Sequence, residues 1–204
     1  MLKEEEEEVQ GWGRARVKEM DAAAVVLPAS IPLYAALLSM ERFFYGLVWH
    51  RPKTAALVLK KDKEPETIFR LVWCFKCVQV AVFASWWYHH FGWTDFDLTA
   101  VPLYLWAASA LLLGVGQVLN ASAWSALGKA GVCYGFSYPE SSWGKQVRWV
   151  TGWPYNVLDS PQYIGAIATV WGLFLFTSAQ VDDWWVLPAI ETFLYALSIH
   201  VLEA

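Results

Sequence analysis

Long apolar runs constrain this chain more than any other feature of its sequence. Stretches of about 20 mostly apolar residues recur along it, and each is long enough to cross the hydrocarbon core of a bilayer. Backbone exposed to lipid must satisfy its own hydrogen bonds, so segments of this kind form α-helices. Hydrophobic residues make up 57% of the chain and charged residues 17%, against about 25% charged in soluble domains. We therefore predict an all-α, polytopic bundle of membrane helices.

Four to five hydrophobic segments are expected, over residues 22–40, 71–91, 99–119, 164–179 and 184–201. Pro28 and Pro32 interrupt the first segment, which fits either a kinked span or a re-entrant segment. Residues 1–21 contain an acidic run at 4–8 and are expected to form a solvated, disordered tail. Residues 22–204 are then a single membrane domain.

The charges between the segments alternate in sign. Lys and Arg gather after the first segment and again between the third and the fourth, at Arg42, Arg51, Lys53, Lys60, Lys61, Lys63, Arg70, Lys129, Lys145 and Arg148. The other turns carry Asp95, Asp97, Asp182 and Asp183. Basic loops face the cytosol by the positive-inside rule. The loop over 122–161 and the C-terminal end are therefore expected on the cytosolic side.

Fourteen tryptophans are an unusual number for 204 residues, and tryptophan favours membrane interfaces. Trp86 and Trp87 are expected to anchor the second segment at the interface, and Lys76 is expected to snorkel there from the same segment. Three cysteines are too few for a structural zinc site, which needs four ligands. The net charge of −4 argues against nucleic acid as a partner, because phosphate binding needs a basic face.

Glycines and aromatic residues gather around the third segment and the loop after it. Gly114 and Gly116 lie one residue apart, and such a pair lets either a ligand or a second helix approach the backbone closely. The loop contains two blocks rich in Gly, Pro and aromatic residues, at 127–135 and 150–165. Loops at a membrane face commonly carry function, although a surface-lying connector with tryptophan anchors would look similar.

In these blocks the chain resembles the integral-membrane phospholipid N-methyltransferases, which form phosphatidylcholine from phosphatidylethanolamine. The resemblance is good over 111–204, and the first half matches only in hydrophobic layout. It rests on Gly114 and Gly116, on Leu127-Gly128 with 131–135, and on Pro154-Tyr155-Asn156-Val157-Leu158-Asp159-Ser160-Pro161-Gln162-Tyr163-Ile164-Gly165. The related isoprenylcysteine carboxyl methyltransferases have a looser form, with a basic pair in place of Asp159-Ser160.

The resemblance implies methyl transfer from S-adenosylmethionine to phosphatidylethanolamine or its mono- and dimethyl derivatives. It implies a site facing the cytosol in the endoplasmic reticulum membrane. The donor would be bound by Gly114, Val115, Gly116, Gln117, Asn120, Tyr134, Gly135, Asn156 and Glu203. Many family members have a second acid where this chain has Ala204. Two spans separate Gly116 from Glu203, so both are expected at the cytosolic edge.

Asp159 and Tyr163 are the candidate catalytic residues. A lipid amine must be neutral to attack, and a primary amine has a pKa of about 10.4, so a base is useful. Asp159 is the first candidate for the base or headgroup contact, and Glu140 and His200 are the next candidates. The alternative for Asp159 is a helix cap ahead of Pro161. Aromatic faces bind quaternary ammonium groups, and the candidates are Tyr134, Trp153, Tyr155 and Tyr163.

Two other functions remain open on the residues alone. One is a carboxyl methyltransferase acting on prenylated cysteine, and the other is a non-enzymatic scaffold or transporter. A transporter places polar groups near mid-bilayer, whereas the polar groups of this chain are expected at the cytosolic edge. The expected partners are a phospholipid substrate and the bilayer, and the sequence gives no indication of an oligomeric state.

Overall fold

A computed structural model of the chain describes residues 30–54, 64–142 and 144–202. The chain divides into two compact units, Met1–Tyr34 and Ala35–Ala204. The described part of the first unit is the opening of one helix. The second unit contains the membrane helices and the candidate site.

The described residues form helices joined by turns, with no β-strand among them. The main helices are α2 (Ser30–His50), α4 (Glu64–Phe91), α5 (Leu103–Val132), α6 (Pro161–Leu175) and α7 (Val186–Leu197). The short helices are η1 (Leu98–Ala100), η2 (Gly135–Ser137), η3 (Gly144–Gln146), η4 (Phe176–Ala179) and the π-helical η5 (Ser198–Leu202). Within the described ranges, four helical stretches are long and apolar enough to cross a membrane, and Val186–Leu202 is a shorter apolar one. The predicted all-α polytopic bundle is confirmed.

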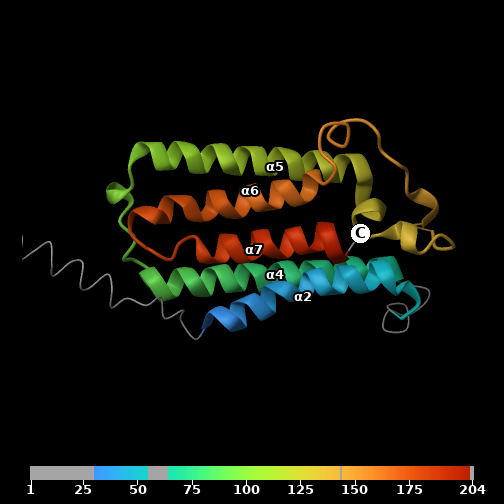
Figure 1. Ribbon diagram of the computed structural model, residues 1–204, viewed down its shortest axis with the longest axis horizontal. Coiled ribbons are helices and arrows are strands. Elements are labelled where there is room, and N and C mark those ends of the chain that lie inside the picture. The colour runs from blue at the N-terminus through green and yellow to red at the C-terminus, as the bar shows by residue number, and fades with distance from the viewer. Residues whose placement is uncertain (1–29, 55–63, 143, 203–204) are drawn as a thin grey trace, which may run out of the picture. The chain divides into compact units, whose positions relative to one another are not determined.

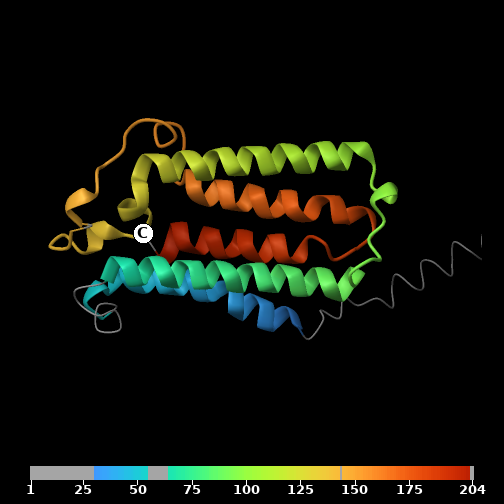
Figure 2. The same ribbon diagram turned by 180° about the vertical axis from the view of Figure 1, so that it is seen from behind.

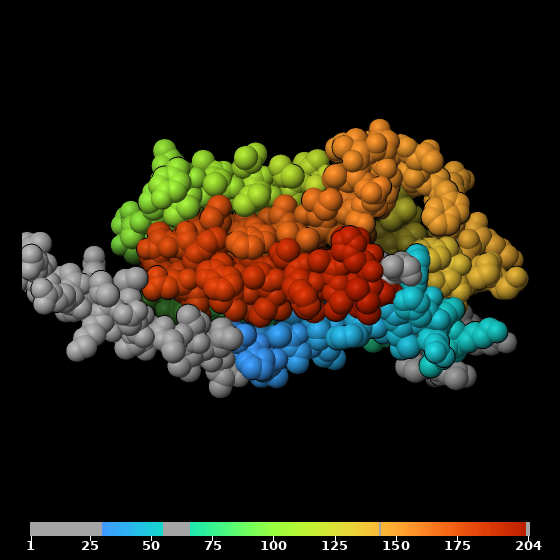
Figure 3. Space-filling model, in the orientation of Figure 1, coloured from blue at the N-terminus to red at the C-terminus, as the bar shows by residue number. Residues whose placement is uncertain are grey.

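Successive helices of the second unit run antiparallel (Figures 1 and 2). The loop over 133–160 lies at one end of the bundle together with the ends of α2, α5 and α7, and we call this the cavity end. The turns over 92–102 and 180–185 lie at the opposite end, which we call the aromatic end. In Figure 3, the side chains of α6 and α7 cover the face between α5 and α2. The alternation agrees with the loop charges, because basic Arg148 and acidic Asp97 lie at opposite ends.

Two helices extend beyond the segments that hydropathy predicted. The first predicted segment ended at residue 40, but α2 continues through Glu41 and Arg42 to His50, so Arg42 does not lie in a loop. The third ended at residue 119, but α5 continues to Val132. Charged and glycine residues look like boundaries in the sequence, whereas a helix continues through them when its neighbours pair with the charges.

The prolines of the first segment have little effect on the described helix. Pro32 lies in the first turn of α2, where a helix has no intrahelical partner for the missing N–H. Residues 22–29, including Pro28, and the predicted tail lie outside the described residues.

Glycines bring α5 and α6 into close contact. A Cβ atom added at Gly116 would lie 2.7 Å from the carbonyl oxygen of Gly165, and one added at Gly165 would lie 2.9 Å from the carbonyl oxygen of Gly116. Further along, a Cβ atom at Gly172 would lie 2.9 Å from Leu113. Small residues at such positions let membrane helices pack backbone to backbone. The contact fixes the start of α6, which borders the candidate site, against α5.

A sharp bend near the end of α5 shapes the cavity end. Gly128 has φ +63° and ψ 178° inside the helix, a conformation that glycine adopts without steric cost. The helix resumes after it and ends at Val132. The bend turns the last residues of α5 toward the other helices (Figure 1), and Tyr134 follows shortly after them in the chain.

Trp86 has a different environment from the one its sequence suggests. The expected interface anchor is instead 2% exposed, and its ring lies 4.9 Å from that of Phe174 in α6. Its neighbour Trp87 packs on Phe91 and Phe96. The expectation for Trp86 is therefore wrong, because the ring fills space between α4 and α6.

Candidate active site

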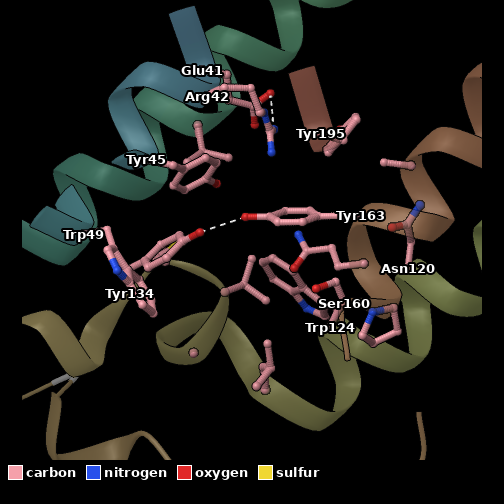
Figure 4. Close-up of a pocket in the computed structure, with 18 of the residues that line it drawn as sticks. Glu41, Arg42, Tyr45, Trp49, Asn120, Trp124, Tyr134, Ser160, Tyr163 and Tyr195 are labelled. Carbon is pink, nitrogen blue, oxygen red and sulfur yellow. Dashed lines mark hydrogen bonds and ion pairs between the residues drawn. The ribbon is translucent and has the colours of Figure 1, made fainter. Parts of the chain in front are cut away.

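A cavity of about 470 Å³ lies at the cavity end, with walls from all five main helices and from the loop before α6. Ligand pockets commonly measure about 300–1,000 Å³. Figure 4 shows how the side chains converge on it. Its polar lining consists of Glu41, Arg42, Tyr45, Lys76, Asn120, Tyr134, Tyr155, Asp159, Ser160, Gln162, Tyr163 and Tyr195.

A buried ion network lies on the α2 side of the cavity. Glu41 and Arg42 are only 5% and 3% exposed. Arg42 Nη2 lies 2.9 Å from Glu41 Oε2, and Lys76 Nζ donates to the same oxygen at 2.9 Å. Removing charges from water is costly unless they are paired. One carboxylate therefore holds two cations from α2 and α4.

The network continues into α7. Lys76 Nζ also donates to Gln79 Oε1 at 3.2 Å, and Gln79 Nε2 donates to Glu191 Oε1 at 2.6 Å. Glu191 is 2% exposed. Lys76 is thus paired with α2 while its side chain stays 38% exposed, and snorkelling to an interface stays a prediction. The network adds polar groups on the helices α2, α4 and α7 to those that the sequence analysis expects at the cytosolic edge.

Three tyrosine rings surround the guanidinium of Arg42 (Figure 4). Its Cζ atom lies 4.4 Å from the ring centroid of Tyr195, 5.3 Å from that of Tyr45 and 5.5 Å from that of Tyr163. Cations are attracted to aromatic faces at such distances. Helices α2, α6 and α7 each supply one ring, so the guanidinium is held by tertiary packing.

Tyr134 closes the cavity on the α5 side. It has φ 55° and ψ 37°, a left-handed conformation that is uncommon for a bulky residue, and it is 8% exposed. Its hydroxyl lies 2.9 Å from the hydroxyl of Tyr163, and its ring lies 4.9 Å from that of Tyr45. Unusual backbone conformations cluster at functional sites. Here the conformation holds the Tyr134 side chain over the cavity.

The rim between α4 and α5 is aromatic and open. Trp73 and Trp124 both line the cavity, yet they are 59% and 45% exposed. The ring of Phe69 lies 6.4 Å from that of Trp124, and Lys129 Nζ lies 3.8 Å from the Phe69 centroid. The cavity therefore reaches the outer, apolar surface of two membrane helices.

The residues before α6 form the last wall. Ser160 is the N-cap residue of α6 and Pro161 follows it, with no side-chain capping bond. Asp159 lines the cavity and is not the cap, so that alternative is wrong. Tyr155 also lines the cavity, and burial raises the pKa of its hydroxyl above the usual value.

Some of the predicted site residues come together in this cavity. Asp159, Tyr163, Asn120 and Tyr134 all line it. Asn120 comes from α5, Tyr163 from α6 and the other two from the loop. These residues are far apart in the sequence, and the antiparallel arrangement and the bend at Gly128 bring them close together in space.

The glycine motif has a different environment. Gly116 lies in the contact with α6, no atom lies within 4 Å of a Cβ added at Gly114, and Val115 is 46% exposed. Gln117 Nε2 donates to Thr169 Oγ1 at 3.0 Å. None of these four residues lines the cavity among the described residues. Because α5 continues to Val132, the expectation that Gly116 marks the end of a span is wrong.

Two further predicted donor-binding residues, Gly135 and Asn156, are described and lie outside the cavity wall. Gly135 is buried at the start of η2, and Asn156 is exposed in the loop. Neither lines the cavity. Glu203 lies outside the described residues, so its meeting with Gly116 stays a prediction.

Sequence reasoning missed the α2 side of the site. Arg42, Tyr45 and Trp49 recur at i, i+3 and i+7, which places them on one helix face. That spacing is a detectable signal once α2 is known to continue past Met40. In the sequence alone, Arg42 resembles the first charge of a cytosolic loop, and this resemblance hides the spacing.

Comparisons with known proteins find similarity in the part of the chain that supplies the C-terminal side of the site. The family model for phospholipid methyltransferases matches residues 104–204. A phosphatidyl-N-methylethanolamine N-methyltransferase of Arabidopsis thaliana is 29% identical over 128 residues, which are 62% of this chain and 68% of the relative. No solved structure matches the chain. The family match includes the cavity residues from Asn120 to Tyr195, whereas Arg42 precedes it.

Proposed function

We propose that this chain, which the phospholipid methyltransferase family model matches over residues 104–204, methylates the headgroup nitrogen of phosphatidylethanolamine or of its mono- and dimethyl derivatives. The methyl donor is S-adenosylmethionine and the final product is phosphatidylcholine. The cavity supports this proposal, because it combines tyrosine walls with an apolar rim toward lipid. Such a chamber suits a cationic headgroup that carries two acyl chains.

The cavity residues fit a cationic methyl donor. The rings of Tyr134 and Trp49 meet edge to face at 5.9 Å, and both line the cavity. Aromatic faces attract cations such as a sulfonium, and Asn120 adds an amide from α5. When bound, the donor supplies the electrophilic methyl group. Asn120 and Tyr134 are the residues that we assign to holding it.

The acceptor amine needs help to lose its proton. A primary amine is mostly protonated at neutral pH, and an apolar site lowers its pKa because burial disfavours the charged form. Asp159 is the candidate base, since a carboxylate in the cavity wall can accept the proton. The hydroxyl of Tyr163 is the candidate hydrogen-bond partner of the amine. Positioning of the two reactants supplies the rest of the rate.

The products gain methyl groups and end as a quaternary ammonium, whose positive charge cannot be removed by loss of a proton. Tyr134 and Tyr163 present aromatic surface at the joined hydroxyls, and quaternary ammonium groups bind such surfaces with about 0.5–2 kcal/mol each. The same rings therefore serve acceptor and product.

The other donor-binding residues implied by the resemblance stay predictions. They are Gly114, Val115, Gly116, Gln117, Gly135, Asn156 and Glu203. Their role requires the donor to extend from the cavity toward the α5–α6 contact or the end of α7.

Purified protein and radiolabelled S-adenosylmethionine test the proposal. Three acceptors are supplied separately: phosphatidylethanolamine, its N-monomethyl form and a prenylated cysteine whose carboxylate is free. Label in the two phospholipids supports the proposal, and the ratio of their rates identifies the preferred step. Label only on prenylcysteine would make the chain a carboxyl methyltransferase, and label on none of the three would refute the activity.

We also propose that the protein lies in the endoplasmic reticulum membrane with its cavity end facing the cytosol. The basic residues at that end support this orientation. Glycosylation acceptors inserted at 92–102 and at 144–153 distinguish the two orientations. Modification at 92–102 alone supports the proposal, and modification at 144–153 alone reverses it.

A further inference from the structure

Arg42 has hydrogen-bonding capacity that the network does not use. A guanidinium presents five N–H donors in a planar fork. Nη2 of Arg42 faces Glu41, but Nη1 is buried and has no hydrogen-bond partner among residues 30–54, 64–142 and 144–202. Buried donors are rarely left unpaired in native proteins. An unpaired charged donor in a cavity wall therefore points to a ligand.

The carboxylate that contacts Arg42 is shared with a second cation. Glu41 carries one negative charge and contacts two cations, Arg42 and Lys76. The second carboxylate of the network, Glu191, bonds to Gln79 and not to either cation. The three tyrosine rings attract the guanidinium but do not neutralise it. Glu41 Oε2 is thus shared between two cations, and Nη1 of Arg42 has no carboxylate oxygen of its own within hydrogen-bond distance among the described residues.

The direction of the guanidinium fits this interpretation. Figure 4 shows Arg42 pointing from the α2 side toward the rings of Tyr163 and Tyr195. Arg42 itself lines the cavity while being 3% exposed. The charge is thus directed at the space that a substrate would fill.

We propose that Arg42 receives an oxyanion of a bound substrate at Nη1, and that this oxyanion is the phosphate diester of the acceptor lipid. The inference rests on the proposed function. Arginine suits phosphate because its planar fork matches two phosphate oxygens. The two-carbon spacer of an ethanolamine headgroup holds its nitrogen close to its phosphate. A phosphate on Arg42 therefore brings the nitrogen to the tyrosine rings beside it.

The rim between α4 and α5 supplies a path for the rest of the lipid. Trp73 and Trp124 are cavity-lining residues with exposed apolar surface, so acyl chains can remain outside while the headgroup lies inside. The carboxylate of the methyl donor has the same chemistry as a phosphate oxygen. The experiment must therefore separate the two sources.

Steady-state kinetics with Arg42→Gln in a maltoside detergent, which has no phosphate, makes this separation. Charged hydrogen bonds contribute about 1.5–3 kcal/mol, so the KM for a short-chain phosphatidyl-N-methylethanolamine should rise about tenfold or more. The KM for S-adenosylmethionine should stay within about twofold. The matched control is Arg70→Gln, because the Arg70 side chain is 77% exposed on α4, and its kinetics should equal those of the wild type.

An acceptor without phosphate tests the contact from the substrate side. A dialkylglycerol ether of N-methylethanolamine keeps the amine and the chains but lacks the anion. The wild type should use it less well than the phospholipid, and Arg42→Gln should use both equally. A rise only in the KM for the donor would reassign Arg42 to the donor carboxylate and overturn the phosphate assignment, as would unchanged kinetics.

A binding measurement keeps the proposal falsifiable if turnover is lost. Short-chain phosphatidylcholine should raise the unfolding temperature of the wild type but not of Arg42→Gln, while S-adenosylhomocysteine should raise both. Arg42→Lys, which keeps the charge, replaces the Gln variant if that protein does not fold, and it should show a reduced lipid shift. A lipid shift that survives in the folded variant refutes the role of Arg42. Absence of methyl transfer by the wild type refutes the proposed function instead.

Discussion

The two ends of the bundle are built from the same kinds of residue and differ in how they fill space. At the aromatic end, rings pack on one another: Trp86 on Phe174, and Trp106 stacked on Phe176 with planes 14° apart. Gln180 bonds to both backbone groups of Asp97 there and ties the two turns together. Among the described residues, the ion pair at this end is that of His90 Nε2 and Asp183 Oδ1, which lie 3.5 Å apart and are partly exposed.

At the cavity end, the rings stand around a hollow. Tyr45, Tyr163 and Tyr195 surround a buried guanidinium, and the chain needs a bend at Gly128 and a left-handed Tyr134 to complete the wall. Empty space and buried charge are both costly. From this difference we expect that the aromatic end contributes stability and that the cavity end binds a ligand.

The largest expected effect is on turnover at the cavity end. Replacing the candidate base in Asp159→Asn should lower kcat about 10²–10⁴-fold, the usual contribution of a positioned acid or base. Asp159 lies in an exposed part of the wall, so the unfolding temperature should not change. Undiminished turnover would remove Asp159 from catalysis, and a large loss of stability would make its role structural.

The complementary change is Trp86→Ala at the aromatic end. Truncating a buried aromatic ring costs about 3–5 kcal/mol of stability. Unfolding measured in detergent should show this loss, while the KM values of the protein that remains folded should equal those of the wild type. Altered KM values at full stability would contradict the division between the two ends.

A smaller effect is expected at the glycine pair of α5. Gly116→Ala should cost about 1–3 kcal/mol through overpacking, because its new Cβ would lie 2.7 Å from the oxygen of Gly165. Gly114→Ala is the matched control, since no atom lies within 4 Å of its new Cβ. Binding of S-adenosylhomocysteine is measured for both variants. Loss of that binding in a stable Gly114→Ala protein would favour the donor-site prediction over simple helix packing.

The smallest effect is expected for the two joined hydroxyls. Tyr134→Phe and Tyr163→Phe each remove one partner of a single hydrogen bond, which contributes about 0.5–1.5 kcal/mol. The double variant should lose less than the sum of the two single losses. Additive losses in a double-mutant cycle of unfolding free energies would show that the two hydroxyls are not coupled.

Much of the bundle was predictable because hydropathy and loop charge are local properties. The five segments, their alternation and the membrane setting all follow from runs such as 99–119 and from the sign of Lys145 and Asp97. The block around Asp159 and Tyr163 was also recognisable, because its order of proline, tyrosine and acid is specific. Asn120 and Tyr134 line the same cavity as that block, and their role in donor binding stays a prediction.

The α2 side of the site was not predictable in the same way. Whether Arg42 starts a loop or continues a helix depends on Glu41 and on Lys76, which lies on a different helix. The hydropathy of Trp86 is the same whether the ring faces lipid or Phe174, so hydropathy does not distinguish the two environments. In each case the deciding partner is distant in sequence.

The sequence by itself determined the all-α arrangement of membrane helices and the resemblance to phospholipid methyltransferases, because apolar length, loop charge and a specific motif are properties of contiguous residues. Only the tertiary structure decided that Gly116 packs against α6, that Trp86 is core, and that Arg42 lies at the cavity with an unused donor. The physical reason is that burial and charge pairing depend on which helices meet, and the local pattern of a segment does not contain that information.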